Sequence, residues 1–344
     1  MKLVFCVPPP EQRVGGLDSA IQSLRRALAD LCIEVIDSLP ERAETDTLVH
    51  FHGLWQPAHA RLAKQCQARG IPYVVSPHGM LEPWAWRHKW WKKWPYFHLV
   101  EKGYLSRAHA LLATAAPEAE RLKKFLPRQR IEPLPLGLTS DARPDYIRAR
   151  QHLDWKSEER VLLFLSRIHV KKGLDLLLQA LASMPMPAGT RLVIVGEGEP
   201  AYVRSLQTFA REHAETLLPI DWVGAVWGEA RWPYFQGADL FCLPTHSENF
   251  GLAVLEACQV GTPALTTVET PWAEQLSSGR GFIGHPNVES VRQILNEIFQ
   301  QPRFDATKRT ELSDWAHANY DWSHLAPRYF GFYEDVLKAS KKRF

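Results

Sequence analysis

Two cations follow one apolar run and directly precede a helical pattern. Residues 161–165 are apolar, and the next eight are Ser-Arg-Ile-His-Val-Lys-Lys-Gly, which places Arg167 and Lys172 in a loop between strand and helix. Cations are not favoured at a helix N-terminus, where the helix dipole is already positive, unless an anion neutralises them. A diphosphate would do so, since Arg167 can bind it in a fork and Lys172 as a point charge. The alternative is a solvated basic loop.

Two glutamates follow a second apolar run, at residues 240–243. Glu248 lies near a predicted helix start, and Glu256 lies within that apolar helix, where an unpaired carboxylate is costly. Hydrogen bonds from ribose hydroxyls would stabilise the Glu256 carboxylate. The alternatives are an ordinary first-turn acid and a salt-bridged helix residue, but neither explains both glutamates together with Gly251. Backbone N–H groups at the helix start, which could hold phosphate or sugar oxygens, belong to Asn249, Phe250, Gly251 and Leu252.

Glycine and histidine mark three further strand ends in the first half of the chain. Gly15 and Gly16 precede a helical pattern, where a ligand could approach the backbone closely, although a plain turn is the alternative. His52 and His78 each end an apolar run and are each followed by glycine. Histidine carries protons near neutral pH. A single histidine in such a place is usually structural, but two at neighbouring strand ends favour a site.

Short apolar runs alternate with longer amphipathic stretches, which predicts an α/β fold with parallel sheets covered by helices on both faces. The expected strands lie at residues 3–7, 33–36, 48–51, 73–76, 110–113 and 131–134, and then at 161–165, 192–195, 220–223, 240–243 and 263–266. A polar stretch at 139–144 predicts a linker. We therefore expect an N-terminal domain over 1–138, a nucleotide-sugar-binding domain over 139–320, and a C-terminal helix over 321–344 that packs back on the first domain. Two facing Rossmann-like halves would hold a ligand in the cleft between them, at the carboxyl ends of the strands.

Composition places few other constraints. The net charge of +3 in 344 residues gives no global basic field, so nucleic acid is not an expected partner. The five cysteines are odd in number and form no Cys-x-x-Cys, which favours reduced cysteine and a cytoplasmic location. The apolar run at the N-terminus is too short for a signal peptide, and no run approaches 18 apolar residues.

Together these motifs resemble glycosyltransferase family 4, which has the GT-B fold and includes retaining enzymes of bacterial polysaccharide and lipopolysaccharide synthesis. The resemblance covers nearly the whole chain, and two glutamates separated by seven residues, with an upstream Arg and Lys, are fairly specific to it. Two departures exist. The chain has Asn249 where the family often has glycine, and Leu136-Gly137-Leu138-Thr139 replaces a common Asn-Gly-Val-Asp.

The resemblance implies a role for each matching residue. Arg167 and Lys172 would hold the donor diphosphate and stabilise the leaving group, Glu256 would bind the ribose, and Glu248 and His78 would lie near the donor sugar. Four of these side chains are the expected catalytic residues: His78, Glu248, Arg167 and Lys172. The expected donor-binding residues further include Gly15, Gly16, Gly196, Val226, Asn249, Phe250, Gly251, Leu252 and Glu256. The expected acceptor side comprises His52, Trp55, His78, Trp84 and Trp86.

The implied reaction transfers a hexose-type sugar, with retention, from a UDP- or GDP-sugar to a glycan or lipid-linked glycan. The family works without a metal or other cofactor, and the chain contains no Asp-x-Asp motif. A nucleotide-sugar epimerase on the same fold and a non-catalytic GT-B partner protein are the alternatives. A dinucleotide dehydrogenase is disfavoured because no Gly-x-Gly-x-x-Gly follows the first strand.

Residues 83–95 are rich in tryptophan and lysine, with no acid between Glu82 and Glu101. One helix over 85–106 would place tryptophans 86, 90, 91 and 94 on one side and lysines 89, 92 and 93 on the other. Three interpretations stay open: residues 84–94 contact an anionic membrane at the inner face of the plasma membrane, the tryptophans stack on acceptor sugars, or they pack inside the domain. No RNA-binding motif accompanies the segment.

Overall fold

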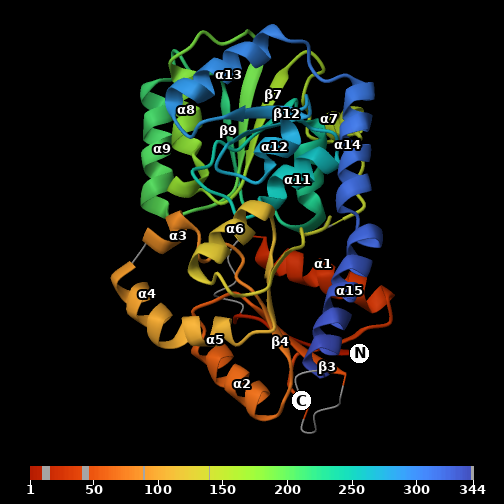
Figure 1. Cartoon of the computed structure of the whole chain (residues 1–344). Helices are drawn as coiled ribbons and strands as arrows, with labels where there is room; N and C mark the ends of the chain where they lie inside the picture. Colours follow the sequence, from red (N-terminus) through yellow and green to blue (C-terminus); the bar gives the residue numbers. More distant parts are fainter. Residues whose placement is uncertain (10–15, 41–45, 88–89, 139, 342–344) are drawn as a thin grey trace. The chain divides into compact units, whose positions relative to one another are not determined.

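Strands and helices alternate along the chain, as the sequence predicts. The computed structural model describes residues 1–9, 16–40, 46–87, 90–138 and 140–341 (Figure 1). The chain divides into two units, Met1–Thr139 with Tyr320–Phe344 (unit 1) and Ser140–Asn319 (unit 2). Each unit is built on a six-stranded sheet in which every neighbouring pair is parallel. The predicted α/β class is confirmed.

The sheet of unit 1 has the strand order β2-β1-β3-β4-β5-β6. Its strands are β1 (Lys2–Cys6), β2 (Glu34–Ile36), β3 (Thr47–His52), β4 (Tyr73–Ser76), β5 (Ala110–Ala113) and β6 (Ile131–Pro133). Its helices are α1 (Leu17–Asp30), α2 (Pro57–Ala68), α3 (Pro83–Arg87), α4 (Trp90–Tyr96), the π-helical turn η2 (Phe97–Glu101), α5 (Lys102–Ser106), α6 (Ala116–Phe125) and α15 (Trp322–Lys341).

Alternate residues of each strand in unit 1 face different helices. Leu3 and Phe5 belong to a core shared with α1 and α15, whereas Val4 and Cys6 belong to a core shared with α2, α5 and α6. Side chains two residues apart share one face of a strand. Since Leu48 joins the core shared with α1 and α15, the side chains at 50 and 52 of β3 lie on that same face. This geometry decides which helices surround the histidines described below.

The sheet of unit 2 has the strand order β12-β11-β10-β7-β8-β9. Its strands are β7 (Arg160–Leu165), β8 (Thr190–Val195), β9 (Ile220–Gly224), β10 (Leu240–Cys242), β11 (Ala264–Thr267) and β12 (Gly281–Gly284). Its helices are α7 (Tyr146–His152), the 3₁₀ turn η3 (Val170–Lys172), α8 (Leu174–Ala182), α9 (Pro200–Glu212), the 3₁₀ turn η4 (Gly228–Arg231), α10 (Trp232–Gly237), α11 (Leu252–Gln259), α12 (Trp272–Leu276), α13 (Val288–Gln300) and α14 (Ala306–Tyr320).

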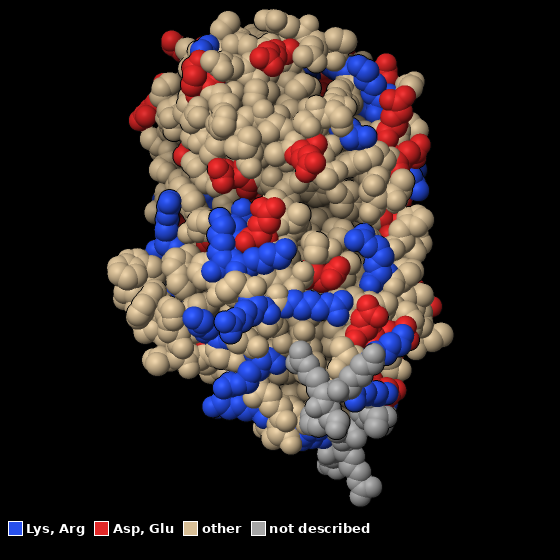
Figure 2. Space-filling view, viewed as in Figure 1, with Lys and Arg blue, Asp and Glu red and all other residues tan. Residues whose placement is uncertain are grey.

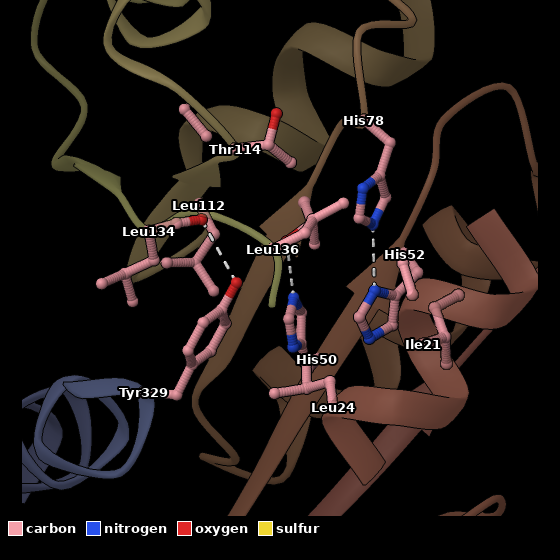
Figure 3. Close-up of a pocket in the computed structure, with 13 residues that line it drawn as sticks. Ile21, Leu24, His50, His52, His78, Leu112, Thr114, Leu134, Leu136 and Tyr329 are labelled. Carbon is pink, nitrogen blue, oxygen red and sulfur yellow. Dashed lines mark hydrogen bonds between the residues drawn. The ribbon is translucent and has the colours of Figure 1, made fainter. Parts of the chain in front are cut away.

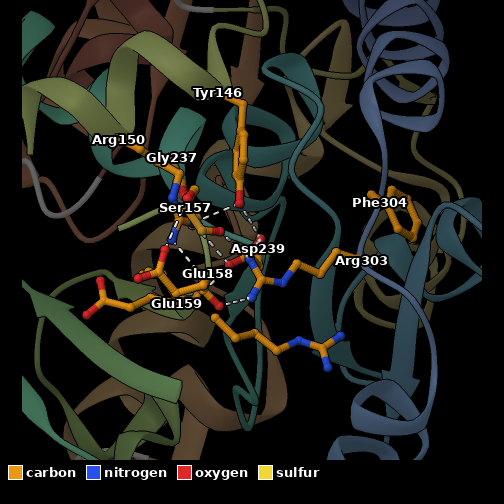
Figure 4. A network of polar contacts seen from close by, with 12 residues as sticks. Tyr146, Arg150, Ser157, Glu158, Glu159, Gly237, Asp239, Arg303 and Phe304 are labelled. Atoms are coloured by element: carbon orange, nitrogen blue, oxygen red, sulfur yellow. Dashed lines mark hydrogen bonds and ion pairs between the residues drawn. The ribbon is translucent and has the colours of Figure 1, made fainter. Parts of the chain in front are cut away.

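A buried ionic network joins α7, β7 and β10 in unit 2 (Figure 4). Asp239 is 5% exposed and accepts hydrogen bonds from the Tyr146 hydroxyl (2.8 Å), the Val161 backbone N–H (2.7 Å) and the Arg150 guanidinium (3.2 Å). Arg150 also donates to the carbonyl of Gly237 (3.1 Å). Because its charged members find several partners, burying them here is tolerable.

The tryptophan-rich segment is not the single helix that we predicted. It comprises α3, α4, η2 and α5, with Pro95 inside α4 and residues 88 and 89 outside the described chain. The predicted grouping of its four tryptophans on one side is also wrong for Trp86. Trp86 packs against Phe97 and Phe125, whereas Trp90, Trp91 and Trp94 are exposed. Within the described residues, no helix is both long and apolar enough to cross a bilayer.

Candidate functional site

Four neighbouring parallel strands of unit 2 carry predicted site residues at their carboxyl ends. The strands β9, β8, β7 and β10 lie side by side. Because parallel strands end at the same edge of a sheet, the loops that follow them meet there. Arg167 and Lys172 follow β7, Gly196 follows β8, Val226 follows β9, and Glu248 follows β10.

Lys172 and Glu248 form an ion pair that joins the loops after β7 and β10. Glu248 is 8% exposed, so the pair is largely shielded from solvent. The same two loops are also joined through the Lys171 carbonyl, which accepts from the Thr245 hydroxyl (2.8 Å) and the His246 backbone N–H (2.8 Å). These bonds fix Lys172 on a rigid support.

Arg167 lies in the same loop and differs from Lys172 in its surroundings. Its side chain is exposed, and within the described part of the chain it makes no hydrogen bond or ion pair. Desolvation by the nearby protein lowers the pKa of Arg167, and the charge of Glu248 opposes that effect. The loop therefore presents one cation without a bonded partner beside a neutral ion pair, which suits an anionic ligand.

Glu256 is paired with a cation that the sequence analysis did not identify. The Arg231 guanidinium donates to the Glu256 carboxylate at 2.9 Å and to the Gly228 carbonyl at 2.7 Å. The salt-bridged alternative for Glu256 is thus what the structure contains, and ribose binding stays a prediction. Arg231 follows Glu229 in an ordinary polar turn, and 25 residues separate it from Glu256, so no local pattern points to the pair.

Two glycines allow close backbone contacts in this region. Gly173 has a φ of 71°, and a Cβ there would lie 2.0 Å from the Pro244 carbonyl oxygen. A Cβ on Gly196 would lie 1.9 Å from the Ser166 carbonyl oxygen. Gly196 therefore lets the loop after β8 pack on the loop that carries Arg167, whatever it also does for a ligand.

Four predicted donor-binding residues lie around the start of α11. Gly251 has left-handed backbone (φ 80°) and precedes the first residue of the helix, Leu252. The Phe250 side chain is buried against Trp272, and its carbonyl accepts from the Trp272 indole. Phe250 can thus offer a ligand its backbone and not its ring. The remaining residue, Asn249, lies in the turn between Glu248 and α11.

His50, His52 and His78 form one cluster in unit 1, in which His50 and His52 are buried and His78 is half-buried (Figure 3). His52 Nδ1 lies 3.1 Å from His78 Nε2, and the two rings are stacked. His50 Nε2 lies 2.8 Å from the Ser76 hydroxyl, and its Nδ1 lies 3.0 Å from the Tyr333 hydroxyl on α15. The sequence analysis placed His52 and His78 at neighbouring strand ends. It did not identify His50 or Tyr333 as members of the cluster.

Burial changes what these histidines can do. Desolvation lowers the pKa of His78 to about 4, and it lowers the pKa of His50 and His52 well below 6.5. All three rings are therefore neutral at pH 7. In the His52–His78 bond one ring donates and the other accepts. His78 is consequently suited to hydrogen bonding with a ligand rather than to carrying a proton near neutral pH, which is the role we had considered.

The turn that carries His78 is held at both ends by α6. The buried carboxylate of Glu118 accepts from the backbone N–H of Gly79 (2.7 Å) and from that of Thr114 (2.7 Å). One turn along α6, Arg121 pairs with Glu82 at 2.7 Å. His78 itself has a φ of 51°, an unusual conformation for a residue with a side chain. Glu118 was missed because an acid in the first turn of a helix is ordinary.

The other predicted site residues of unit 1 do not belong to the histidine cluster. Gly15 lies outside the described residues, and Gly16 is the exposed N-cap of α1. Trp55 follows β3, and its ring contacts Trp86 of α3. Trp84 is half-buried on the same helix.

Family models match both units. Residues 3–137 match a glycosyl transferase 4-like domain, and residues 145–315 match glycosyl transferases group 1. Among curated proteins, a glycogen synthase of Desulfitobacterium hafniense is 27% identical over 222 residues, covering 60% of this chain and 46% of that protein. A GDP-mannose-dependent alpha-(1-6)-phosphatidylinositol dimannoside mannosyltransferase of Mycobacterium tuberculosis is 32% identical over 196 residues, covering 54% of this chain and 49% of that protein. The chain spans about half the length of these relatives.

Solved structures match the whole chain in fold. Sucrose-phosphate synthase from Thermosynechococcus elongatus matches 98% of this chain and 100% of its own, with a TM-score of 0.82 and 17% identity. Anabaena HepE in complex with UDP and glucose matches 97% of this chain and 100% of its own, with a TM-score of 0.73 and 17% identity. The two family models show that the chain belongs to the family 4-like glycosyltransferases, and the solved structures show that it has the GT-B fold.

Proposed function

We propose that the protein is a retaining, metal-independent hexosyltransferase that uses a UDP- or GDP-sugar donor and a glycan or lipid-linked glycan acceptor. The observation that carries the proposal is the cation arrangement at the edge of the second sheet, where Arg167 has no bonded partner among the described residues and lies in the same loop as Lys172 of the Lys172–Glu248 pair. A nucleoside diphosphate is the anion that such an edge suits in an α/β fold. The range of the family and the tryptophan-rich segment support a role in cell-surface polysaccharide or lipopolysaccharide synthesis at the inner face of the plasma membrane.

Two of the similar proteins support the donor class. Anabaena HepE was solved with UDP and with UDP-glucose, and the mycobacterial mannosyltransferase is GDP-mannose-dependent. Donors that carry uracil and donors that carry guanine therefore both belong in a first donor screen.

In the proposed reaction, the bond between the anomeric carbon and the β-phosphate oxygen breaks. The acceptor hydroxyl oxygen bonds to the anomeric carbon on the same face, and its proton passes to the departing phosphate. Negative charge builds on the β-phosphate, where Arg167 and Lys172 stabilise it. Glu248 orients Lys172, and neutral His78 hydrogen-bonds a sugar hydroxyl. Glu256, held by Arg231, binds the ribose.

A thermal-shift screen tests the proposal. The full chain is melted with UDP, GDP, ADP, dTDP, CMP and their sugars in the presence of a chelator. A ligand at about 100 times its Kd stabilises the fold by about 2.7 kcal/mol, so one nucleotide series should raise the Tm clearly. Arg167→Ala should remove most of that rise, because it deletes the unpaired cation of the loop.

Arg292→Ala is the matched control, since Arg292 is an arginine of the same unit that pairs with Glu289 on the surface. It should keep the full nucleotide shift. If no nucleotide shifts the Tm, or if every shift requires a divalent metal, the assignment of this edge as a metal-independent donor site is wrong.

A further inference from the structure

Three tryptophans of one short helix are exposed. Trp90, Trp91 and Trp94 of α4 leave 57%, 58% and 53% of their surfaces accessible, and Leu99 in the next turn leaves 83%. Indole rings are normally buried for most of their area. At about 100° per residue these three side chains spread over an arc of roughly 100°, so they form a broad aromatic face rather than a single stacking platform.

The exposed tryptophans contribute little to the packing of the segment: among the described residues, Trp94 contacts the ring of His98, which is itself exposed (4.6 Å between ring centres). Trp86, one helix earlier, contacts Trp55, Phe97 and Phe125. Lys93 donates to the Ala85 carbonyl and lies 5.7 Å from the centre of the Trp55 ring. Other side chains thus anchor α3 and α4, and packing inside the domain does not account for the three exposed rings.

The two acids that flank the segment are turned inward. Glu82 is 4% exposed and pairs with Arg121, and Glu101 is 1% exposed and accepts from the Trp55 backbone N–H (2.8 Å). Among the described residues from 83 to 102, the charged side chains left exposed are the cations Arg87, Lys92 and Lys102. Among the described residues of its own segment, the aromatic face is therefore flanked by exposed cations and by no exposed carboxylate.

The charge of the whole unit has the same sign. Unit 1 contains 24 Lys and Arg against 16 Asp and Glu, whereas unit 2 contains 17 against 22. On the face of unit 1 drawn in Figure 2, Lys and Arg side chains predominate. An anionic partner would thus be attracted to unit 1 and not to unit 2.

We propose that the surface formed by Trp90, Trp91, Trp94 and Leu99, bordered by Arg87, Lys92 and Lys102, docks on the anionic surface of a lipid bilayer. Tryptophan favours the headgroup region, where its ring is apolar and its N–H stays hydrated, and cations near the surface add attraction to anionic lipids. The segment lies on the bilayer without crossing it. The inference rests on the surface alone and does not depend on the proposed transfer reaction.

Vesicle sedimentation tests the inference with the full chain. We expect binding to vesicles of equal parts phosphatidylcholine and phosphatidylglycerol, little binding to phosphatidylcholine alone, and weaker binding as salt rises. The triple variant Trp90→Ala, Trp91→Ala, Trp94→Ala should lose most binding. The double variant Arg87→Gln, Lys92→Gln should bind mixed vesicles about fivefold more weakly for each cation removed.

Trp227→Ala is the matched control, because Trp227 in unit 2 is 72% exposed and lies outside the proposed surface. It should sediment like the wild type. The triple variant should also keep the wild-type Tm, since its three side chains are exposed, and this separates loss of binding from loss of fold.

Several outcomes would overturn the inference. One is equal sedimentation of the triple variant and the wild type. Another is a dimer, detected by light scattering, that the triple variant abolishes while vesicle binding is absent in both proteins. A third is a triple variant that sediments normally but has a raised KM for a short, water-soluble acceptor, which would assign the tryptophans to sugar stacking.

Discussion

At the scale of single residues, the position of His78 depends on a carboxylate that the sequence gives no reason to single out. Glu118 accepts three hydrogen bonds, from the backbone N–H groups of Gly79 and Thr114 and from the Thr114 hydroxyl (2.9 Å). Burial raises the pKa of Glu118, and these donors oppose the rise by stabilising its charged form. Glu118 is thus a positioning residue for the turn that carries His78.

The variant Glu118→Gln should distinguish an effect on the position of His78 from an effect on the stability of the fold. The amide keeps one acceptor oxygen and places an NH₂ group against a backbone N–H. We therefore expect a stability loss of about 2 kcal/mol and a fall in kcat of about tenfold or more, since small displacements of reacting groups are costly. The Tm shift produced by the donor nucleotide, whose proposed site lies in unit 2, should remain.

Glu120→Gln is the control, because Glu120 is exposed on the same helix. It should change neither kcat nor stability. If Glu118→Gln lowers stability but leaves kcat unchanged, the contact with Gly79 is structural only.

The sequence predicted which side chains gather at strand ends better than it predicted their partners. His52 and His78 follow from strand position, because neighbouring parallel strands end together. Their neutral state does not follow, since it depends on burial by α1, α15 and the strands around them. The Arg231–Glu256 pair is similarly a product of tertiary packing.

At the scale of elements, agreement with the sequence follows the strength of the hydrophobic pattern. The strand predicted at 73–76 is observed at those residues because a short apolar run between turns has few alternatives. The strand β12 was missed because its four residues, Gly-Phe-Ile-Gly, contain two glycines. In place of the helix predicted over 85–106 the chain forms α3, α4, η2 and α5, and Trp86 packs on Trp55, Phe97 and Phe125, contacts that a helical repeat alone cannot foresee.

The variant Asp239→Asn tests whether the ionic network around Asp239 stabilises unit 2 against unfolding. The substitution removes the charge that compensates Arg150, which is itself 3% exposed. Leaving a buried cation without its partner typically costs about 3 kcal/mol or more. Urea unfolding should therefore show a loss of that order.

Asp314→Asn is a suitable control, because its pair with Arg143 is exposed and should contribute less than about 1 kcal/mol. Equal, small losses in both variants would mean that the backbone carbonyls around Arg150 satisfy it without Asp239.

At the scale of the whole molecule, the doubled series of strands and helices predicted two α/β halves. It did not predict how charge and buried histidine divide between them. His50, His52, His59 and His78, whose pKa values burial lowers, all belong to unit 1. Unit 1 also carries the excess of cations. Acid should therefore destabilise unit 1.

The sign of this pH dependence can be worked out. An unfolded histidine binds a proton near pH 6.5, whereas folded His59 and His78 do so only near pH 4. The unfolded chain thus holds more protons in this window, and the free energy of unfolding falls as pH drops from 6.5 towards 4. Glu101, whose pKa burial raises to about 7, and Glu118 act in the opposite direction, because protonation favours their folded forms. Four histidines outweigh two glutamates, so the net stability should fall.

The variant His59→Gln measures the contribution of one of these histidines to the pH dependence of stability. We expect its unfolding free energy, measured by urea titration from about pH 7 to pH 4.5, to fall less steeply than that of the wild type, with a difference of about 2.4 kcal/mol accumulated over the window. The slope with pH is the measured quantity, so a constant loss of stability from the substitution does not affect it. His152→Gln, at an exposed position on α7, should keep the wild-type slope. Parallel slopes for His59→Gln and the wild type would mean that His59 binds its proton equally well in the folded and unfolded chain, and that burial in unit 1 does not make the fold sensitive to acid.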